Sequence, residues 1–211
     1  MVIDLTHTMR PGMPVYPGTE SPQFVNACGI ARNGFAEKKM TFFSHTGTHM
    51  DVPAHIIRGG ATVDQLSPDR FYGKACMVDV RPKTGRAIDM DMIRPFEGLM
   101  RDMDFVLLRS GWSRFWDDDA YFQGYPVLTP DTAAWISVLG LKGLGIDMIS
   151  VDKEGSTDFP IHRTLLEQDT LIIENLTNLH AVPAASFAFW CLPLKIENGD
   201  GSPVRAVAVV K

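Results

Sequence analysis

Three of the six histidines in this chain, His45, His49 and His55, lie within eleven residues, and Asp51 lies between them. Imidazole and carboxylate groups are common ligands of divalent metals, and an additional histidine nearby can transfer a proton. The structural alternative is a polar turn whose histidines are only surface or core groups. Three histidines and one aspartate at alternating positions favour a metal site that carries out chemistry.

This histidine-rich segment is predicted to be extended and to bend at Gly47. Its β-branched residues, Gly47 and Pro53 all disfavour a helix, and in a strand its odd-numbered side chains share one face. A straight strand would separate the Cα atoms of His45 and His49 by roughly 13 Å, too far for both to bind one tetrahedral ion. A bend at Gly47 shortens this distance, and the missing side chain is expected to leave open space over the metal.

A second pair of candidate ligands lies far along the sequence. Glu174 follows the apolar residues 171–173, and a buried carboxylate is costly unless it is paired or binds a metal. Alternatively, Glu174 lies in solvent or pairs with Arg163. His162 follows Pro160 and, taken alone, is more typical of a structural hydrogen-bonding group. Both become candidate ligands because the first motif is expected to bind a metal ion that they could also contact.

Four other titratable residues have less specific interpretations. His7 follows a predicted strand, where structural packing is favoured, and His180 is predicted to lie in a loop. Asp147 and Asp152 flank the end of a predicted strand. They could orient a ligand histidine from behind, as carboxylates often do at metal sites.

The spacing His45-x-Gly47-Thr48-His49-x-Asp51-x-Pro53-x-His55 resembles the signature of the metal-dependent cyclase family, which includes bacterial kynurenine formamidases and isatin hydrolases. The resemblance extends along nearly the whole chain. It includes residues 4–7, 16–18 and 145–152, followed by the positions of His162 and Glu174.

The resemblance implies a role for each matching residue. The first metal ligands would be His45, His49 and Asp51, and the aspartate would bridge to a second ion. His162 and Glu174 would hold that second ion. Zinc suits these ligands, as one ion or two, and manganese tolerates the same set.

The last histidine of the motif, His55, would be the catalytic acid/base. The implied activity is hydrolysis of a small formyl or cyclic amide, in which metal-activated water attacks the carbonyl carbon. N-formylkynurenine, a compound of tryptophan catabolism, is the leading substrate. A lactam such as isatin is the alternative within this class, and a non-catalytic metal- or ligand-binding protein is the alternative outside it.

The substrate is left open by departures from the kynurenine formamidase pattern. Those enzymes usually carry Trp before the Pro-Gly of the opening segment and Asp after it, where this chain has Tyr16 and Thr19. Flat apolar side chains should hold an aromatic substrate. The candidates, each equally suited to a core position, are Tyr16, Phe42, Phe43 and Trp112.

Composition is typical of one globular enzyme domain spanning residues 1–211. The net charge of −5 and the absence of a basic stripe argue against a nucleic-acid partner. The start of the chain does not resemble a secretory signal, and no apolar run is long enough to cross a membrane, so a cytoplasmic location is expected. Cys28, Cys76 and Cys191 are therefore predicted to be reduced thiols.

The order of elements predicts a mixed α/β fold. Residues 10–22 are rich in proline and form a predicted arm or loop, and residues 117–122 form a predicted exposed polar element. Helices are expected at 89–99, 129–139 and 163–168. Strands are expected at 1–8, 24–30, 38–44, 73–80, 105–109, 144–149, 171–173, 185–194 and 204–210.

Two further expectations come from the resemblance. It implies the swivelling β/β/α fold, with a mixed sheet and two or three helices. It also implies a homodimer or homotetramer, in which the arm at residues 10–22 could complete the pocket of a neighbouring copy.

Overall fold

The fold of residues 1–81 and 87–210 is described by a computed structural model, and it is built around a closed mixed barrel. Within these residues, seven strands pair in the order β12-β11-β5-β7-β9-β10-β4, and β4 pairs back onto β12. The strands are β4 (His49–Asp51), β5 (Tyr72–Asp79), β7 (Phe105–Arg109), β9 (Gly143–Ile146), β10 (Leu171–Glu174), β11 (Ser186–Pro193) and β12 (Gly201–Val209).

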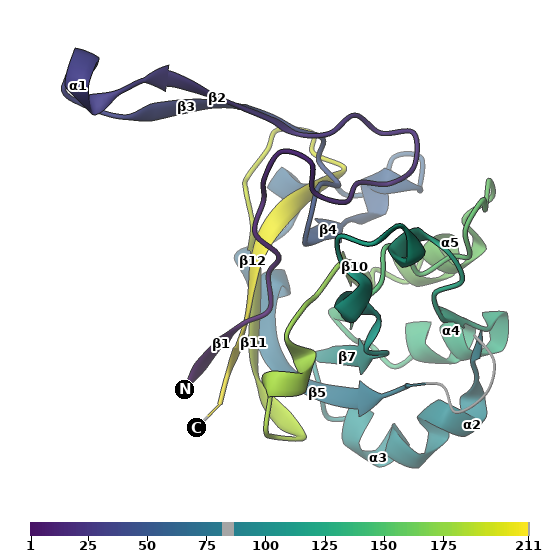
Figure 1. Ribbon diagram of the computed structural model, residues 1–211. Coiled ribbons are helices and arrows are strands. Elements are labelled where there is room, and N and C mark those ends of the chain that lie inside the picture. The colour runs from purple at the N-terminus through teal and green to yellow at the C-terminus, as the bar shows by residue number, and fades with distance from the viewer. Residues whose placement is uncertain (82–86, 211) are drawn as a thin grey trace.

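The barrel combines a parallel part and an antiparallel part. Strands β5, β7, β9 and β10 are parallel neighbours, whereas β4, β11 and β12 join through antiparallel pairings. Strand β1 (Val2–Asp4) pairs with β12, so the two ends of the chain lie side by side (Figure 1). The family resemblance implied a mixed sheet, but its closure by β4 and β12 was not expected.

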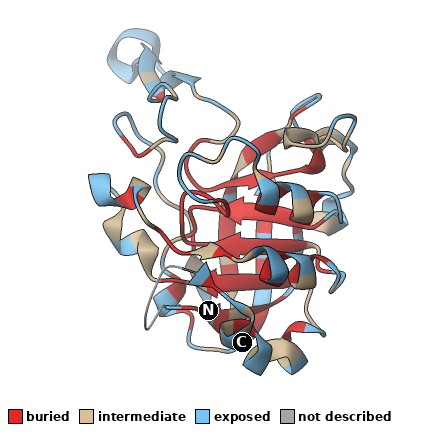
Figure 2. Cartoon of the chain, turned by 90° about the vertical axis from the view of Figure 1, so that its right-hand side faces the viewer, coloured by how far each residue is buried: buried red, intermediate tan, exposed pale blue. Residues whose placement is uncertain are grey.

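Alternation of side chains along the strands separates two hydrophobic cores. In β7, Phe105 and Leu107 belong to one cluster, and Val106 and Leu108 belong to the other. Successive strand residues face opposite sides of a sheet, which explains this division. The buried positions concentrate on the strands (Figure 2).

The longer helices cover one side of the barrel (Figure 1). Helix α4 (Pro130–Ser137) begins as predicted, with Thr129 as its N-cap and Pro130 at its first position. Helix α5 (Pro160–Leu166) begins three residues before the predicted range 163–168, because Pro160 also suits a first helical position. His162 therefore lies within the first turn of α5.

Two predicted elements differ from the structure. The helix predicted at 89–99 is divided into α2 (Met90–Ile93), a 3₁₀ turn (Arg94–Phe96) and α3 (Glu97–Met100), because Pro95 lacks an N–H donor. Residues 117–120 of the predicted polar element are exposed, as expected, and a 3₁₀ turn spans Asp119–Phe122. Its Tyr121 is fully buried and donates a hydrogen bond to Asn175 Oδ1 (2.7 Å).

The remaining short elements lie outside the barrel. Strands β2 (Gln23–Cys28) and β3 (Glu37–Thr41) form a hairpin that projects from the body, with α1 (Ile30–Asn33) at its tip (Figure 1). Strands β6 (Ala87–Ile88) and β8 (Val127–Leu128) pair separately. Further 3₁₀ turns are Pro53–His55, Val63–Gln65, Pro68–Phe71, Trp112–Phe115 and Leu179–Ala181.

Two other sequence expectations can be compared with the structure. Residues 10–22 form neither helix nor strand, as predicted. The three cysteines are free, and Cys76 and Cys191 are buried, in agreement with reduced thiols packed in the core. Within the described ranges, no helix has both the length and the apolar character needed to cross a bilayer.

Candidate metal centre

Strand register brings the candidate ligands together. Strand β4 carries His49 and Asp51, and in its antiparallel pairing with β10 His49 lies directly opposite Glu174. Asp51 lies opposite Gly201 of β12 on the other side. Two segments more than a hundred residues apart therefore share one buried end of the barrel.

The backbone bends at Gly47, as the ligand geometry predicted. Gly47 has φ +70°, a conformation that glycine adopts without steric cost. Its carbonyl accepts a hydrogen bond from His49 Nδ1 (2.9 Å), so His49 Nε2 remains free. The expectation of open space over a metal was wrong, because a Cβ at Gly47 would meet Met13 Cε at 3.0 Å.

His162 is oriented by a carboxylate behind it. Its Nδ1 lies 2.7 Å from Asp152 Oδ2, and Asp152 also accepts hydrogen bonds from the backbone N–H groups of Ile161 and His162 at the start of α5. This arrangement agrees with the orienting role considered for Asp152. Asp147 does not have this orienting role, because its carboxylate instead accepts hydrogen bonds from the backbone N–H groups of Ser110 and Gly111.

The free nitrogens of His49 and His162 face a buried pair of carboxylates. His49 Nε2 lies 3.2 Å from Asp51 Oδ1 and 3.5 Å from Glu174 Oε2. His162 Nε2 lies 3.6 Å from Asp51 Oδ2 and 3.4 Å from Glu174 Oε1. All four residues are at most 4% exposed.

This environment shifts the pKa values of Asp51 and Glu174 in opposite directions. Burial and the negative charge of Asp51 raise the pKa of Glu174. Burial opposes ionisation of Asp51 as well, but the nearby His49 and His45 outweigh it and hold the pKa of Asp51 well below its usual range. The cluster thus keeps a buried carboxylate ionised among imidazoles.

These residues fit a divalent metal. Asp51 Oδ2 is buried and has no hydrogen-bond partner, which is costly unless a cation satisfies it. Candidate ligand atoms of His45, His49 and Asp51 lie within 4.8 Å of one another. Mixed imidazole and carboxylate donors suit zinc and manganese.

His45 lies at the more open side of the cluster. Its Nδ1 is 2.6 Å from Asp51 Oδ1, and its Nε2 is 3.1 Å from Asp200 Oδ2. Burial acts to lower the pKa of His45, but the two carboxylates outweigh burial and raise it to about 10. Protons therefore compete with any metal for the ring nitrogens of His45.

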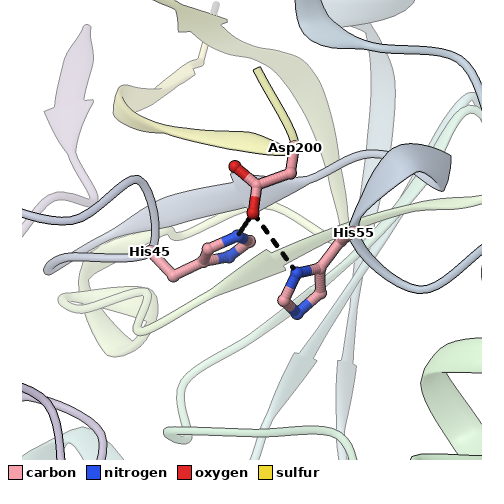
Figure 3. A group of neighbouring side chains, drawn as sticks. All are labelled: His45, His55 and Asp200. Carbon is pink, nitrogen blue, oxygen red and sulfur yellow. Dashed lines mark hydrogen bonds and ion pairs between the residues drawn. The ribbon is translucent and has the colours of Figure 1, made fainter. Parts of the chain in front are cut away.

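His55 lies beside His45 at the end of the 3₁₀ turn Pro53–His55. The two rings are 4.0 Å apart between centroids, and His55 Nδ1 is 3.7 Å from Asp200 Oδ2 (Figure 3). Burial lowers the pKa of His55 to about 4, despite the opposing charge of Asp51. His55 is thus a neutral imidazole at neutral pH.

Asp200 and Gly201 belong to the site, and sequence reasoning missed both. A Cβ on Gly201 would come within 2.6 Å of His45 Cε1 and 2.7 Å of Met50 O, so only glycine leaves room for the His45 ring. The signal in the sequence was the turn-forming run Gly199-Asp200-Gly201, which places a carboxylate between two glycines.

A cavity of about 300 Å³ opens onto the cluster. Tyr16 and Phe43, two of the predicted aromatic residues, line it together with Phe159. Phe42 is not among its lining residues. Trp112 is also absent from the lining, because its indole donates to Tyr121 O (3.0 Å) and it packs against the core on the helix side.

The two remaining histidines lie outside this cluster. The ring of His7 stacks on Trp116, with ring centroids 3.8 Å apart, and the backbone N–H of His7 donates to Thr48 Oγ1 (2.9 Å). This is the structural packing expected of His7. His180 lies in the 3₁₀ turn Leu179–Ala181.

Residues 3–153 match the family model described as "Putative cyclase". The chain belongs to this cyclase family. The resemblance read from its histidine-rich motif is therefore confirmed.

Named relatives and solved structures agree with this family membership. The chain is 33% identical to a kynurenine formamidase of Salinibacter ruber over 98% of this chain and 96% of that protein. It is 31% identical to a kynurenine formamidase of Erythrobacter litoralis, covering 97% and 91% of the two chains. An isatin hydrolase bound to the product analogue thioisatinate has a TM-score of 0.88 and 26% identity, covering 99% of this chain and 92% of that one.

Proposed function

We propose that this cyclase-family protein is a metal-dependent hydrolase of a small formyl or cyclic amide, with N-formylkynurenine as the leading substrate. The observation that carries the proposal is the buried cluster of His49, Asp51, His162 and Glu174, in which Asp51 Oδ2 has no hydrogen-bond partner. A buried carboxylate with an unsatisfied oxygen among imidazoles has an energetic reason to bind a cation.

In this proposal the ligands form two sets that share Asp51. One set is His45, His49 and Asp51, and the other is His162, Glu174 and the same Asp51. When bound there, zinc or manganese would polarise a carbonyl group and lower the pKa of a water molecule toward neutrality.

His55 is proposed as the general acid/base. Its lowered pKa of about 4 leaves the ring neutral at neutral pH, so it can accept the proton that water releases as its oxygen bonds to the carbonyl carbon. The same proton then passes from His55 to the amide nitrogen as the C–N bond breaks. With N-formylkynurenine the products are formate and an aromatic amine.

The lining of the cavity favours an aromatic substrate, and the relatives suggest two classes of amide. Tyr16, Phe43 and Phe159 can contact a flat ring beside the cluster. Identity to the kynurenine formamidases favours a formyl amide, and structural similarity to an isatin hydrolase makes a lactam the second candidate. A non-catalytic binding protein is disfavoured, because a storage site needs ligands but no additional proton carrier such as His55.

Turnover of N-formylkynurenine and of isatin by the zinc-loaded protein tests this function. We expect metal-dependent hydrolysis of N-formylkynurenine that is lost on chelation and falls about 10²–10⁴-fold in His55→Ala, with the metal content nearly unchanged. Hydrolysis of isatin alone would select the lactam alternative. Turnover of neither substrate, with metal still bound, would reject both.

A homodimer is proposed on the basis of the projecting hairpin. Val25, Ile30, Phe35 and Met40 are each more than half exposed, and an isolated two-stranded hairpin is only marginally stable in water. Residues 23–43 carry three basic groups and one acidic group, whereas the whole chain has a net charge of −5, so the hairpin complements the body of a second copy.

Light scattering after size-exclusion chromatography tests the dimer. The wild-type protein is expected to have twice the chain mass, and Val25→Ser/Met40→Ser should shift it toward the monomer. A monomeric wild-type protein at micromolar concentration would contradict this proposal.

A further inference from the structure

Asp200 presents a carboxylate to both His45 and His55. It lines the cavity, and its side chain is 47% exposed. Its backbone is held in place, because its carbonyl accepts a hydrogen bond from Val52 N (3.3 Å) and the next residue, Gly201, pairs with Asp51. The start of β12 therefore holds the backbone of Asp200 beside the two imidazoles.

One oxygen of Asp200 is placed between the two rings. Oδ2 lies 3.1 Å from His45 Nε2 and 3.7 Å from His55 Nδ1 (Figure 3). The second distance is longer than a hydrogen bond. Because the side chain is half exposed, a small rotation can bring the carboxylate within hydrogen-bonding distance of His55.

The chemistry expected of His55 requires a particular tautomer. A general base must offer an unprotonated nitrogen, and in neutral imidazole the other nitrogen then carries the proton. A carboxylate at Nδ1 accepts that proton in a hydrogen bond and leaves Nε2 available. A ring nitrogen of His55 also lies within 4.8 Å of ligand atoms of Asp51 and His162, so the ring reaches the buried cluster.

We propose that Asp200 is the positioning residue for His55, holding it as the Nδ1–H tautomer with Nε2 directed to the substrate. This inference rests on the proposed function of His55. Asp200 acts through His55, and it is not required for binding the metal. An alternative role as a metal ligand, suggested by its short distance to His45, predicts loss of metal when Asp200 is changed.

Kinetics of Asp200→Asn test the proposal. We expect kcat to fall about 10–100-fold with KM and metal content little changed, and Asp200→Glu to recover part of the loss. In a His55→Ala background, Asp200→Asn should cause no further loss, because the two residues act as a unit. Glu197→Gln, which removes an exposed carboxylate of the same loop, is the matched control and should behave like the wild type.

A second measurement does not depend on the substrate. With only six histidines in the chain, NMR of ¹⁵N-histidine-labelled, zinc-loaded protein can assign the tautomer of His55. The proposal predicts Nδ1–H in the wild type and loss of that preference in Asp200→Asn. An Nε2–H tautomer, a fully additive loss in the His55→Ala background, or loss of metal in Asp200→Asn would overturn it. Absence of wild-type turnover, with Nδ1–H still observed, would instead count against the proposed function alone.

Discussion

At the scale of single residues, the site depends on which nitrogen of each histidine is already occupied. Gly47 O accepts a hydrogen bond from His49 Nδ1, and Asp152 accepts one from His162 Nδ1. Both rings therefore present Nε2 to the carboxylates of Asp51 and Glu174. Such contacts fix the tautomer and orientation of ligand histidines. The sequence suggested Asp152 as such a partner, whereas the backbone carbonyl of Gly47 could not be predicted from residue types.

Gly201 provides a test at this scale. In Gly201→Ala the new Cβ would collide with the His45 ring and with Met50 O, so His45 must move. We expect a loss of about 1–3 kcal/mol in the free energy of unfolding, measured by urea denaturation, and weaker zinc binding.

Gly98→Ala is the matched control, because a Cβ there meets nothing within 4 Å and Gly98 lies in helix α3. Gly98→Ala should leave zinc binding unchanged and slightly increase the free energy of unfolding. Wild-type zinc affinity in Gly201→Ala would show that His45 does not need this space.

At the scale of elements, local signals were sufficient where one residue determines a boundary. Thr129-Pro130 predicted the start of α4, and the range predicted for β7 agrees with the structure. Pro95 divides the helix that was predicted as continuous at 89–99. Glu174 was expected just beyond a strand but is the last residue of β10, because β4 pairs with it.

The N-cap of α4 gives a prediction at the element scale. Thr129 Oγ1 accepts a hydrogen bond from Thr132 N (3.3 Å), and its removal leaves that donor unsatisfied. Thr129→Ala should cost about 1 kcal/mol and lower Tm by about 2–4 °C, with hydrolysis unchanged. Thr157→Ala, which changes an exposed threonine, should leave Tm unchanged. Equal Tm values for the two variants would argue that the Thr129 cap contributes nothing.

At the scale of the whole molecule, closure of the barrel assembles the site. Pairing of β12 with β4 brings residues 200 and 201 beside the histidine-rich segment. The motif itself predicted His45, His49 and Asp51 as neighbours, because their separation along the chain is short. Asp200 could not be found in that way, since only the closed topology connects it to His55. The swivelling β/β/α class implied by the family stays a prediction.

The dependence of stability on pH is a property of the whole chain to which His7 contributes. Burial against Trp116 lowers the pKa of His7 to about 4, with Asp117 opposing the shift, whereas an unfolded histidine has a pKa of about 6.5. Between these values the unfolded chain binds a proton that the folded chain does not. This contribution to stability is therefore present above pH 6.5 and lost as the pH falls toward 4.

His7→Phe retains an aromatic ring against Trp116 and removes the titration. Between about pH 7 and about pH 5, the wild-type protein should lose on the order of 1 kcal/mol more unfolding free energy than the variant, a value reduced for the solvent-exposed part of the ring. Urea denaturation at the two pH values measures the difference. Parallel losses in both proteins would show that His7 titrates normally when folded.

The central claim is that the buried histidine and carboxylate cluster holds a divalent metal. Elemental analysis of the purified protein, beside Asp51→Asn, tests it most directly. Asp51 is shared by both proposed ligand sets, so the wild type should contain one or two zinc or manganese ions per chain and Asp51→Asn much less. A metal-free wild type that does not bind added zinc or manganese, or unchanged metal content in Asp51→Asn, would contradict the account.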